Sequence, residues 1–143
     1  MKAFTRACLA LTVVSVLFGC SPAKDADVKT ATSAAEGWLA MVDSGRYGES
    51  WDAASAVFQE KISKSQWEST QGGGRSAYGD VVSRQLKSAS YETNVAGGPA
   101  GNYVVIQYRT KFANSRSLTE NLTEIQQPSG EWRVAAYFVR PVG

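Results

Sequence analysis

The sequence predicts an α+β fold in which about three N-terminal helices pack on a four-stranded antiparallel sheet. Two observations lead to this prediction. Between residues 28 and 67, apolar side chains recur at spacings of three and four, which is the helical period. After Asp80, apolar and polar side chains alternate in stretches that turn-forming residues separate, as in a strand meander.

The first helix is expected to begin at Asp25 or Asp27, either of which can act as its N-cap, and to end near Gly45. Its apolar face consists of Val28, Ala31, Ala35, Trp38, Leu39 and Val42. A second helix with the same period is expected from Arg46 to Ile62, and its aromatic residues make a wide apolar stripe.

Ser63 and Gln66 have the spacing of a capping box, which predicts the start of a third, shorter helix that carries Trp67. Three consecutive glycines, residues 72–74, are poor helix formers and are expected to end or fray this helix.

Strands are expected over residues 82–95, 103–112 and 117–126, with a final strand from Trp132 through Phe138. The clearest alternation puts one set of side chains on a dry face: Val104, Ile106, Tyr108, Thr110 and Phe112. Because a sheet with one apolar face must cover it, the helices are expected to form a second layer across the sheet. This order of elements resembles the cystatin-like cone of the nuclear-transport-factor and ketosteroid-isomerase folds, a likeness that is compatible with binding, catalysis or scaffolding.

The first twenty residues have the features of an export signal. Lys2 and Arg6 precede an apolar stretch, residues 7–18, that is too short to cross a bilayer as a stable helix. Gly19 and Cys20 then resemble the lipobox of bacterial lipoproteins, although Phe18 is bulkier than the residue usual at its position. The resemblance implies cleavage before Cys20 and attachment of acyl chains such as palmitate to that cysteine.

This interpretation divides the chain into a signal peptide (1–19), a lipidated flexible tether (20–25) and a single globular domain (26–143). Ser21 resembles the outer-membrane sorting pattern, so we expect a lipid-anchored protein of the cell envelope that faces the periplasm from the outer membrane. The alternatives are a conventional signal peptide cut near Gly19, with a free cysteine, or an uncleaved anchor.

Charge and composition exclude several function classes. The chain has 15 Lys and Arg against 13 Asp and Glu. Lys2 and Arg6 belong to the signal, so the mature part is formally neutral, and we expect no nucleic-acid partner. Histidine is absent from the sequence, which removes imidazole bases, Ser-His-Asp and Cys-His catalysis and most zinc sites. We therefore expect neither a metal nor a cofactor.

Several short motifs agree in order with one bacterial protein family. They are Ala35-Glu36-Gly37-Trp38-Leu39, Val42-Asp43-Ser44-Gly45-Arg46-Tyr47, Ser50-Trp51, Ser63-Lys64-Ser65-Gln66-Trp67 and Gly130-Glu131-Trp132-Arg133-Val134 with Tyr137. Together they resemble a family of uncharacterised lipoproteins and exported proteins, the domain of unknown function numbered four-zero-one-nine. The resemblance implies no activity and no site residue apart from the lipid cysteine.

The four tryptophans could line a ligand pocket, but their core spacing favours packing: Trp38, Trp51, Trp67 and Trp132. Three arginines, Arg84, Arg109 and Arg133, could share one sheet face and bind an anion, although a polar outer face needs no such role.

Three carboxylates remain as acid or base candidates, namely Asp52, Asp80 and Glu120, although most such residues are solvated charges or caps. Two functions are therefore open. The first is a non-enzymatic envelope lipoprotein that binds a small ligand or a protein partner. The second is an isomerase-like or hydrolytic enzyme that uses carboxylates in a cone-shaped pocket.

Overall fold

The computed structural model describes residues 21–142, and this part of the chain forms an α+β domain of four helices and a four-stranded antiparallel sheet. The helices are α1 (Pro22–Asp43), α2 (Tyr47–Ala53), α3 (Ala56–Lys61) and α4 (Lys64–Tyr78). The strands are β1 (Val81–Glu92), β2 (Tyr103–Phe112), β3 (Ser117–Gln126) and β4 (Trp132–Pro141), and they pair in chain order. The predicted fold class and strand order are confirmed.

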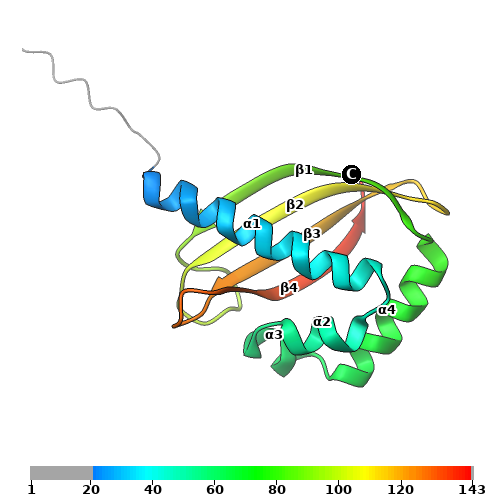
Figure 1. Cartoon of the computed structure of the whole chain (residues 1–143), viewed down its shortest axis with the longest axis horizontal. Helices are drawn as coiled ribbons and strands as arrows, with labels where there is room; N and C mark the ends of the chain where they lie inside the picture. Colours follow the sequence, from blue (N-terminus) through cyan, green and yellow to red (C-terminus); the bar gives the residue numbers. More distant parts are fainter. Residues whose placement is uncertain (1–20, 143) are drawn as a thin grey trace, which may run out of the picture.

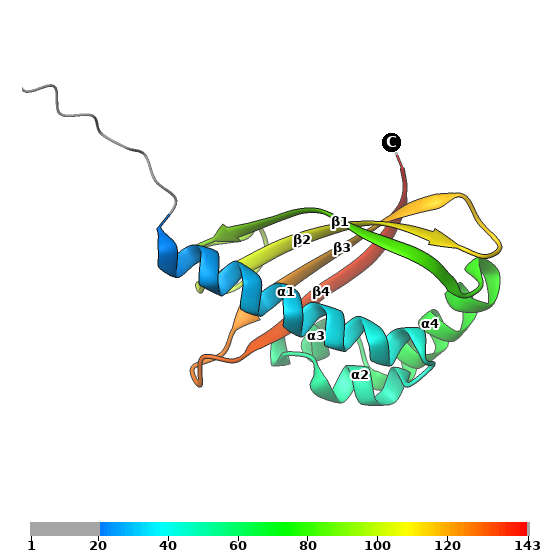
Figure 2. The same ribbon diagram turned by 45° about the horizontal axis from the view of Figure 1, so that its top comes forward.

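The helices form a layer on one face of the curved sheet. Figures 1 and 2 both show α1 crossing the strands, and α1 contacts all four of them. Helix α2 packs on α1 and α4, whereas α3 lies against β4. Within residues 21–142, the helices fall short of the length and apolarity that a membrane crossing requires.

The main core lies between α1 and the inner face of the sheet. On β2, the predicted dry face is confirmed, because Val104, Ile106, Tyr108, Thr110 and Phe112 are all buried. The other side of β2 carries the exposed Arg109 and Lys111. Tyr103 departs from this pattern, since the loop before it folds over its ring and joins it to a small cluster with Ile125 and Ala135.

The tryptophans belong to this core, as their spacing predicts. Trp38, Trp67 and Trp132 are buried, and Trp51 packs against the same cluster. Their indole N–H groups find partners: Trp38 donates to the Ser50 carbonyl oxygen at 2.7 Å, Trp51 to the Ile62 carbonyl oxygen at 2.8 Å and Trp67 to Ser50 Oγ at 2.9 Å. Each hydrogen bond ties an aromatic ring to a neighbouring helix.

The start of α1 differs from the prediction. Ser21 occupies the N-cap and Pro22 the first helical position, where the fixed φ of proline is favourable. Asp25 lies in the first turn, where its charge opposes the helix dipole, but it is not the cap. Residues 22–25 are therefore helical and not a flexible tether. The predicted signal peptide and Cys20 lie outside the described residues.

The predicted second helix is broken into α2 and α3. The chain leaves the helical conformation at Ala54, and the Ser55 N–H donates to the Val134 carbonyl oxygen on β4 at 2.9 Å. The Ser55 side chain then caps α3 by accepting from the Phe58 N–H. A hydrogen bond to the sheet thus outweighs the continuous helical period of this segment.

Helix α4 does not end at its glycines, contrary to the prediction. Its capping box at Ser63 and Gln66 is present, but the helix continues through residues 72–74 to Tyr78. Contacts beyond the glycines stabilise the last turn, since Arg75 forms ion pairs and the Tyr78 ring packs against Phe112 with centroids 5.6 Å apart. Tertiary packing outweighs the low helix propensity of glycine here.

Candidate functional site

The three predicted carboxylates lie in different environments. Asp52 is exposed on α2 and pairs with Lys64 Nζ at 2.6 Å. Asp80 is exposed between α4 and β1. Glu120 is fully buried on the inner face of β3. The structure therefore does not assemble the three into one site, and only Glu120 has the burial that an acid or base candidate requires.

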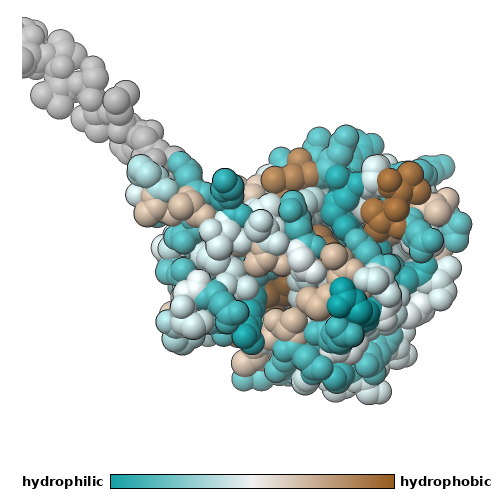
Figure 3. Space-filling view, viewed as in Figure 1, coloured by the Kyte–Doolittle hydropathy of each residue, from teal (hydrophilic) through white to brown (hydrophobic). Residues whose placement is uncertain are grey.

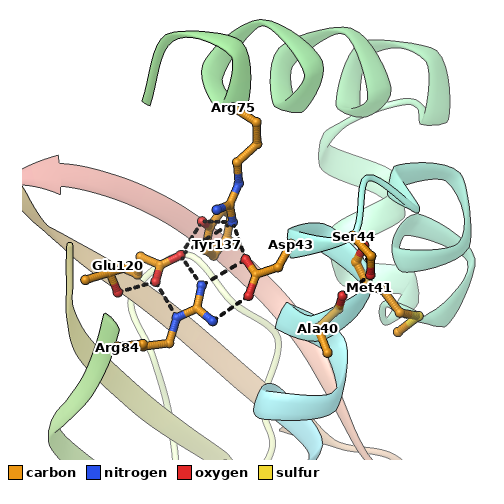
Figure 4. A network of polar contacts seen from close by, with 9 residues as sticks. Ala40, Met41, Asp43, Ser44, Arg75, Arg84, Glu120 and Tyr137 are labelled. Atoms are coloured by element: carbon orange, nitrogen blue, oxygen red, sulfur yellow. Dashed lines mark hydrogen bonds and ion pairs between the residues drawn. The ribbon is translucent and has the colours of Figure 1, made fainter. Parts of the chain in front are cut away.

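Glu120 is the buried member of a partly buried ionic cluster, which we call the arginine cluster: Asp43, Arg75, Arg84, Glu120 and Tyr137. Figure 4 shows that Arg84 lies between the two carboxylates and makes a fork to each. Its Nη1 and Nη2 donate to Asp43 Oδ2 and Oδ1 at 2.7 and 3.0 Å, and its Nε and Nη2 donate to Glu120 Oε2 and Oε1 at 2.6 and 3.1 Å. These two bidentate pairs join α1, β1 and β3.

The remaining donors of the cluster surround Glu120. The Tyr137 hydroxyl donates to Oε1 at 2.7 Å, and the Thr110 hydroxyl donates to Oε2. Arg75 Nη2 lies 3.0 Å from Asp43 Oδ1 and 3.7 Å from Glu120 Oε1. The Glu120 carboxylate is thus saturated by donors, which suits it to a structural role and leaves no lone pair free for proton transfer.

The cluster also fixes protonation states. Burial alone would lower the pKa of Arg84, but the hydrogen bonds to Asp43 and Glu120 outweigh it and raise that pKa further above its ordinary range. Burial and the Glu120 charge raise the pKa of Tyr137, so its hydroxyl keeps the proton that it donates. The arginine cluster thus links the helix layer to the sheet through hydrogen bonds and ion pairs.

A second buried carboxyl, Glu124, has the opposite environment. It lies four residues after Glu120 on the same inner face of β3, between Val104 and Val134, and is 1% exposed. Neither of its carboxylate oxygens has a hydrogen-bond partner within residues 21–142. Burial raises the pKa of Glu124 to about 8, so the carboxyl is mostly protonated near neutral pH.

Glu124 is among the residues that line a groove of about 460 Å³ between α1, α2 and β4, which we call the Glu124 groove. Its walls include Ala34, Trp38 and Met41 of α1, Asp52 of α2 and Trp132 of β4. Figure 3 shows the molecular surface hollowed between α1 and α2, with hydrophobic residues at the bottom. The lining thus combines apolar side chains with a few polar groups, Glu124 among them, as is typical of a small-molecule site.

Tyr108 on β2 is a second unpartnered group on this inner face. Its hydroxyl is buried and makes no hydrogen bond to residues 21–142. Burial, followed by the charge of Glu36, raises the pKa of Tyr108 to about 12, and Glu124 also contributes to this shift. The phenol therefore stays neutral and lies within electrostatic reach of the groove carboxyl.

The predicted anion site of three arginines is wrong. Arg84 points to the inner face, where it binds Asp43 and Glu120. Arg109 is exposed on the outer face, and Arg133 pairs with Glu131 at 3.1 Å. A strand register that places Arg84 opposite Thr110 puts Arg109 on the other side of the sheet.

Sequence reasoning missed Glu124, although a signal for it was present. Glu120, Leu122 and Glu124 alternate along β3, so one apolar residue and two acids share the inner face. An acid on the predicted apolar face of a strand is unusual enough to mark a site. Within residues 21–142, no group of acidic or cysteine side chains is arranged to hold a metal ion.

The fold, the core and the two buried carboxyls define a small α+β domain with a saturated ionic cluster and a groove beside an unpaired carboxyl. Residues 34–137 match the family described as "Protein of unknown function (DUF4019)". Because the match covers more than half of the chain, this protein belongs to that family. Comparisons with curated proteins and with solved structures give no match.

Proposed function

We propose that this protein is a non-enzymatic binding module of the cell envelope that takes a small ligand into the Glu124 groove. The observation that carries the proposal is the Glu124 carboxyl, which is 1% exposed, has no partner among the described residues and belongs to the lining of a groove that also has apolar walls. Glu120, buried on the same strand, differs in having all its oxygens occupied.

The physical reason is the cost of burying an unpaired polar group. A buried donor or acceptor without a partner costs about 1 to 3 kcal/mol, and more if it is charged. A ligand that offers a hydrogen-bond donor to Glu124 would recover this energy on binding. The groove walls, which include Trp38, Met41 and Trp132, would cover an apolar ligand body.

The envelope location rests on the first twenty residues, which lie outside the described part of the chain. In this proposal, acyl chains on Cys20 hold the domain at the periplasmic face of the outer membrane, and helix α1 begins directly after the anchor at Pro22. A lipid anchor close to a rigid helix would keep the Glu124 groove near the membrane surface.

The Cys20→Ala variant tests the anchor. Without the thiol there is no site for lipid, so the variant is expected to move from the membrane to the soluble envelope fraction. Fractionation followed by detection of the chain measures this, with Asp52→Asn as a control that leaves the anchor intact. Unchanged membrane fractionation of Cys20→Ala would contradict the anchor and leave the groove untouched.

Ligand binding is tested by NMR of the indole N–H signals during a screen of small apolar compounds that carry one hydrogen-bond donor. Trp38 and Trp132 line the groove, whereas the Trp51 indole N–H is held by Ile62 outside it. Ligands are expected to shift the Trp38 and Trp132 signals and leave Trp51 in place. A screen that moves neither groove signal would contradict the proposal.

A second function, proton transfer in the same groove, is favoured by one observation. A carboxyl with a pKa of about 8 in an apolar environment has the property of an enzymatic general acid or base. A compound found in the screen is incubated with the protein in D₂O. If the protein only binds the compound, the compound is recovered unchanged. If the protein transfers protons, carbon-bound hydrogen is exchanged for deuterium, and mass spectrometry detects the added mass.

A further inference from the structure

We infer that the ligand of the Glu124 groove is an organic cation, a protonated amine on an apolar or aromatic body, whose ammonium pairs with the Glu124 carboxylate. This inference rests on the proposed function and names its ligand class. Three observations carry it: the unpartnered carboxyl, the balance of charge around the groove and the chemistry of the walls.

The first observation is that the lining of the groove includes a carboxyl whose two oxygens are buried and unpartnered. Both oxygens of Glu124 lack partners in the described chain, and the carboxyl becomes an acceptor at all its lone pairs once it is ionised. An ammonium group supplies up to three N–H donors and a compensating charge at a single point. An alcohol supplies one donor and no charge, so it satisfies the site less well.

The second observation is that the charged groups of the groove favour a cation. Besides Glu124, the lining includes the carboxylates Asp52 and Glu131, and one cation, Arg133. Arg133 already pairs with Glu131 at 3.1 Å, and Lys64, outside the lining, pairs with Asp52 at 2.6 Å. Neither basic side chain bonds to Glu124. The other charges of the groove pair among themselves, so the Glu124 carboxylate, once it is ionised, is the charge of the lining that a bound cation would balance.

The third observation concerns the walls. Trp38 and Trp132 present indole rings, and Met41 a thioether, to the same groove. Aromatic faces attract ammonium groups as well as apolar rings, and a methionine adapts to the shape of a bound group. A primary amine with an aromatic body of modest size would use both the carboxyl and the walls.

Binding of a cation has a consequence for protons. Because burial holds the free carboxyl in its protonated form near neutral pH, an ammonium ligand must displace that proton to form the ion pair. The charged groups that line the groove with Glu124 are Asp52 of α2 and Glu131 and Arg133 of β4, and Tyr108 of β2, on which Glu36 of α1 also acts, lies within its electrostatic reach. Among them, Glu124 is the one whose pKa is raised to about 8, so affinity should rise with pH up to that value.

The test is calorimetric titration of the purified full chain with three compounds of the same size and different charge. The compounds are 2-phenylethylamine, 2-phenylethanol and phenylacetate, each titrated at pH 7 in two buffers of different ionisation enthalpy. We expect the amine to bind at least tenfold more tightly than the alcohol, with release of nearly one proton, and phenylacetate to bind least. Raising the pH from 6 to 8 should tighten amine binding by roughly fiftyfold, in step with the ionised fraction of Glu124, and leave the alcohol unchanged.

The Glu124→Gln variant removes the charge while it keeps the size of the side chain. It is expected to lose the preference for the amine and the proton release, but to keep binding 2-phenylethanol, which shows that the groove remains folded. Glu60→Gln, an exposed position on α3 that does not line the groove, is the matched control and should retain both the preference and the proton release.

Three results would overturn the inference. Equal binding of the amine and the alcohol, or an amine preference that survives in Glu124→Gln, rejects a cation on Glu124 while the proposed binding function stands. Failure of all three compounds to bind at millimolar concentration rejects the inference and the proposed function together.

Discussion

At the residue scale, Glu120 and Glu124 show how two identical side chains on one strand acquire different roles. Both lie on the inner face of β3, and both are at most 1% exposed. Glu120 accepts from Arg84, Tyr137 and Thr110, whereas Glu124 has no partner among residues 21–142. The difference follows from position, since Glu120 meets the end of α1 and Glu124 belongs to the lining of the groove.

The raised pKa of Glu124 makes folding stability depend on pH. The unfolded chain releases this proton near pH 4.5, whereas the folded chain holds it up to about pH 8. Stability therefore falls as pH rises between these values, by up to about 1.4 kcal/mol per pH unit from this group. Urea unfolding at pH 5, 6.5 and 8 gives the free energy of unfolding of the wild type and of Glu124→Gln. The effect is the difference between the two proteins in how steeply this free energy changes with pH. The same pH dependence of the unfolding free energy in both proteins would contradict the burial of an unpaired acid.

Arg84 is expected to be the most costly residue of the arginine cluster to truncate. Arg84→Ala leaves the buried Glu120 without its bidentate partner, and loss of one member of a buried ion pair costs about 3 to 5 kcal/mol. Arg84→Lys should be intermediate, because a single ammonium cannot fork to Asp43 and Glu120 at once. Arg109→Ala, which removes an exposed arginine from the neighbouring strand, should change the free energy of unfolding by less than about 0.5 kcal/mol. Denaturant unfolding measures all three.

At the element scale, the strands followed the sequence pattern more closely than the helices did. The predicted bounds 103–112 and 117–126 agree with β2 and β3, because alternation reports directly which side of a sheet is buried. The helical region failed where long-range contacts decide the outcome: Ser55 bonds to Val134 and splits one predicted helix, and Arg75 anchors a helix across its glycines. The spacing of apolar residues along the chain cannot predict such long-range contacts.

Helix α4 gives a prediction at this scale. Gly73 is helical, and a Cβ added there meets no atom within 4 Å, so Gly73→Ala should raise stability by about 1 kcal/mol through helix propensity. Gly79 ends the helix at φ 77° and ψ −170°, where an added Cβ would lie 2.9 Å from the Asn114 side chain. Gly79→Ala should therefore lower stability by about 1 to 3 kcal/mol. Thermal unfolding compares the pair, and a destabilised Gly73→Ala would show that the glycines have another role.

At the scale of the whole molecule, the arginine cluster and the Glu124 groove divide the space between helices and sheet. The cluster joins the end of α1 to α4, β1, β3 and β4, and thereby holds α1 at one end of the sheet. The groove lies along the same helix, between α1, α2 and β4. We infer that the arginine cluster holds α1 at a fixed distance from the sheet, so that the groove keeps its shape when no ligand is bound.

The sequence allowed prediction of the layered fold, the dry face of the sheet and the burial of the tryptophans. It also placed Glu120 among the candidates, but alternation alone could not show that Arg84 and Tyr137 would occupy that carboxylate. Glu124 escaped prediction because the absence of a partner is a property of the whole tertiary structure. The alternation along a strand predicts on which face of the sheet a side chain lies, but not which groups of other elements it will contact.

The most direct test of the binding function is the pKa of Glu124, measured from the pH dependence of its side-chain carboxyl ¹³C signal by NMR. The assignment comes from comparison with Glu124→Gln. We predict that the pKa of Glu124 is about 8 in the free protein and that this pKa falls by at least one unit when 2-phenylethylamine is present. A pKa near 4.5 in the free protein, unchanged by the amine, would contradict a buried, unpaired carboxyl that awaits a ligand.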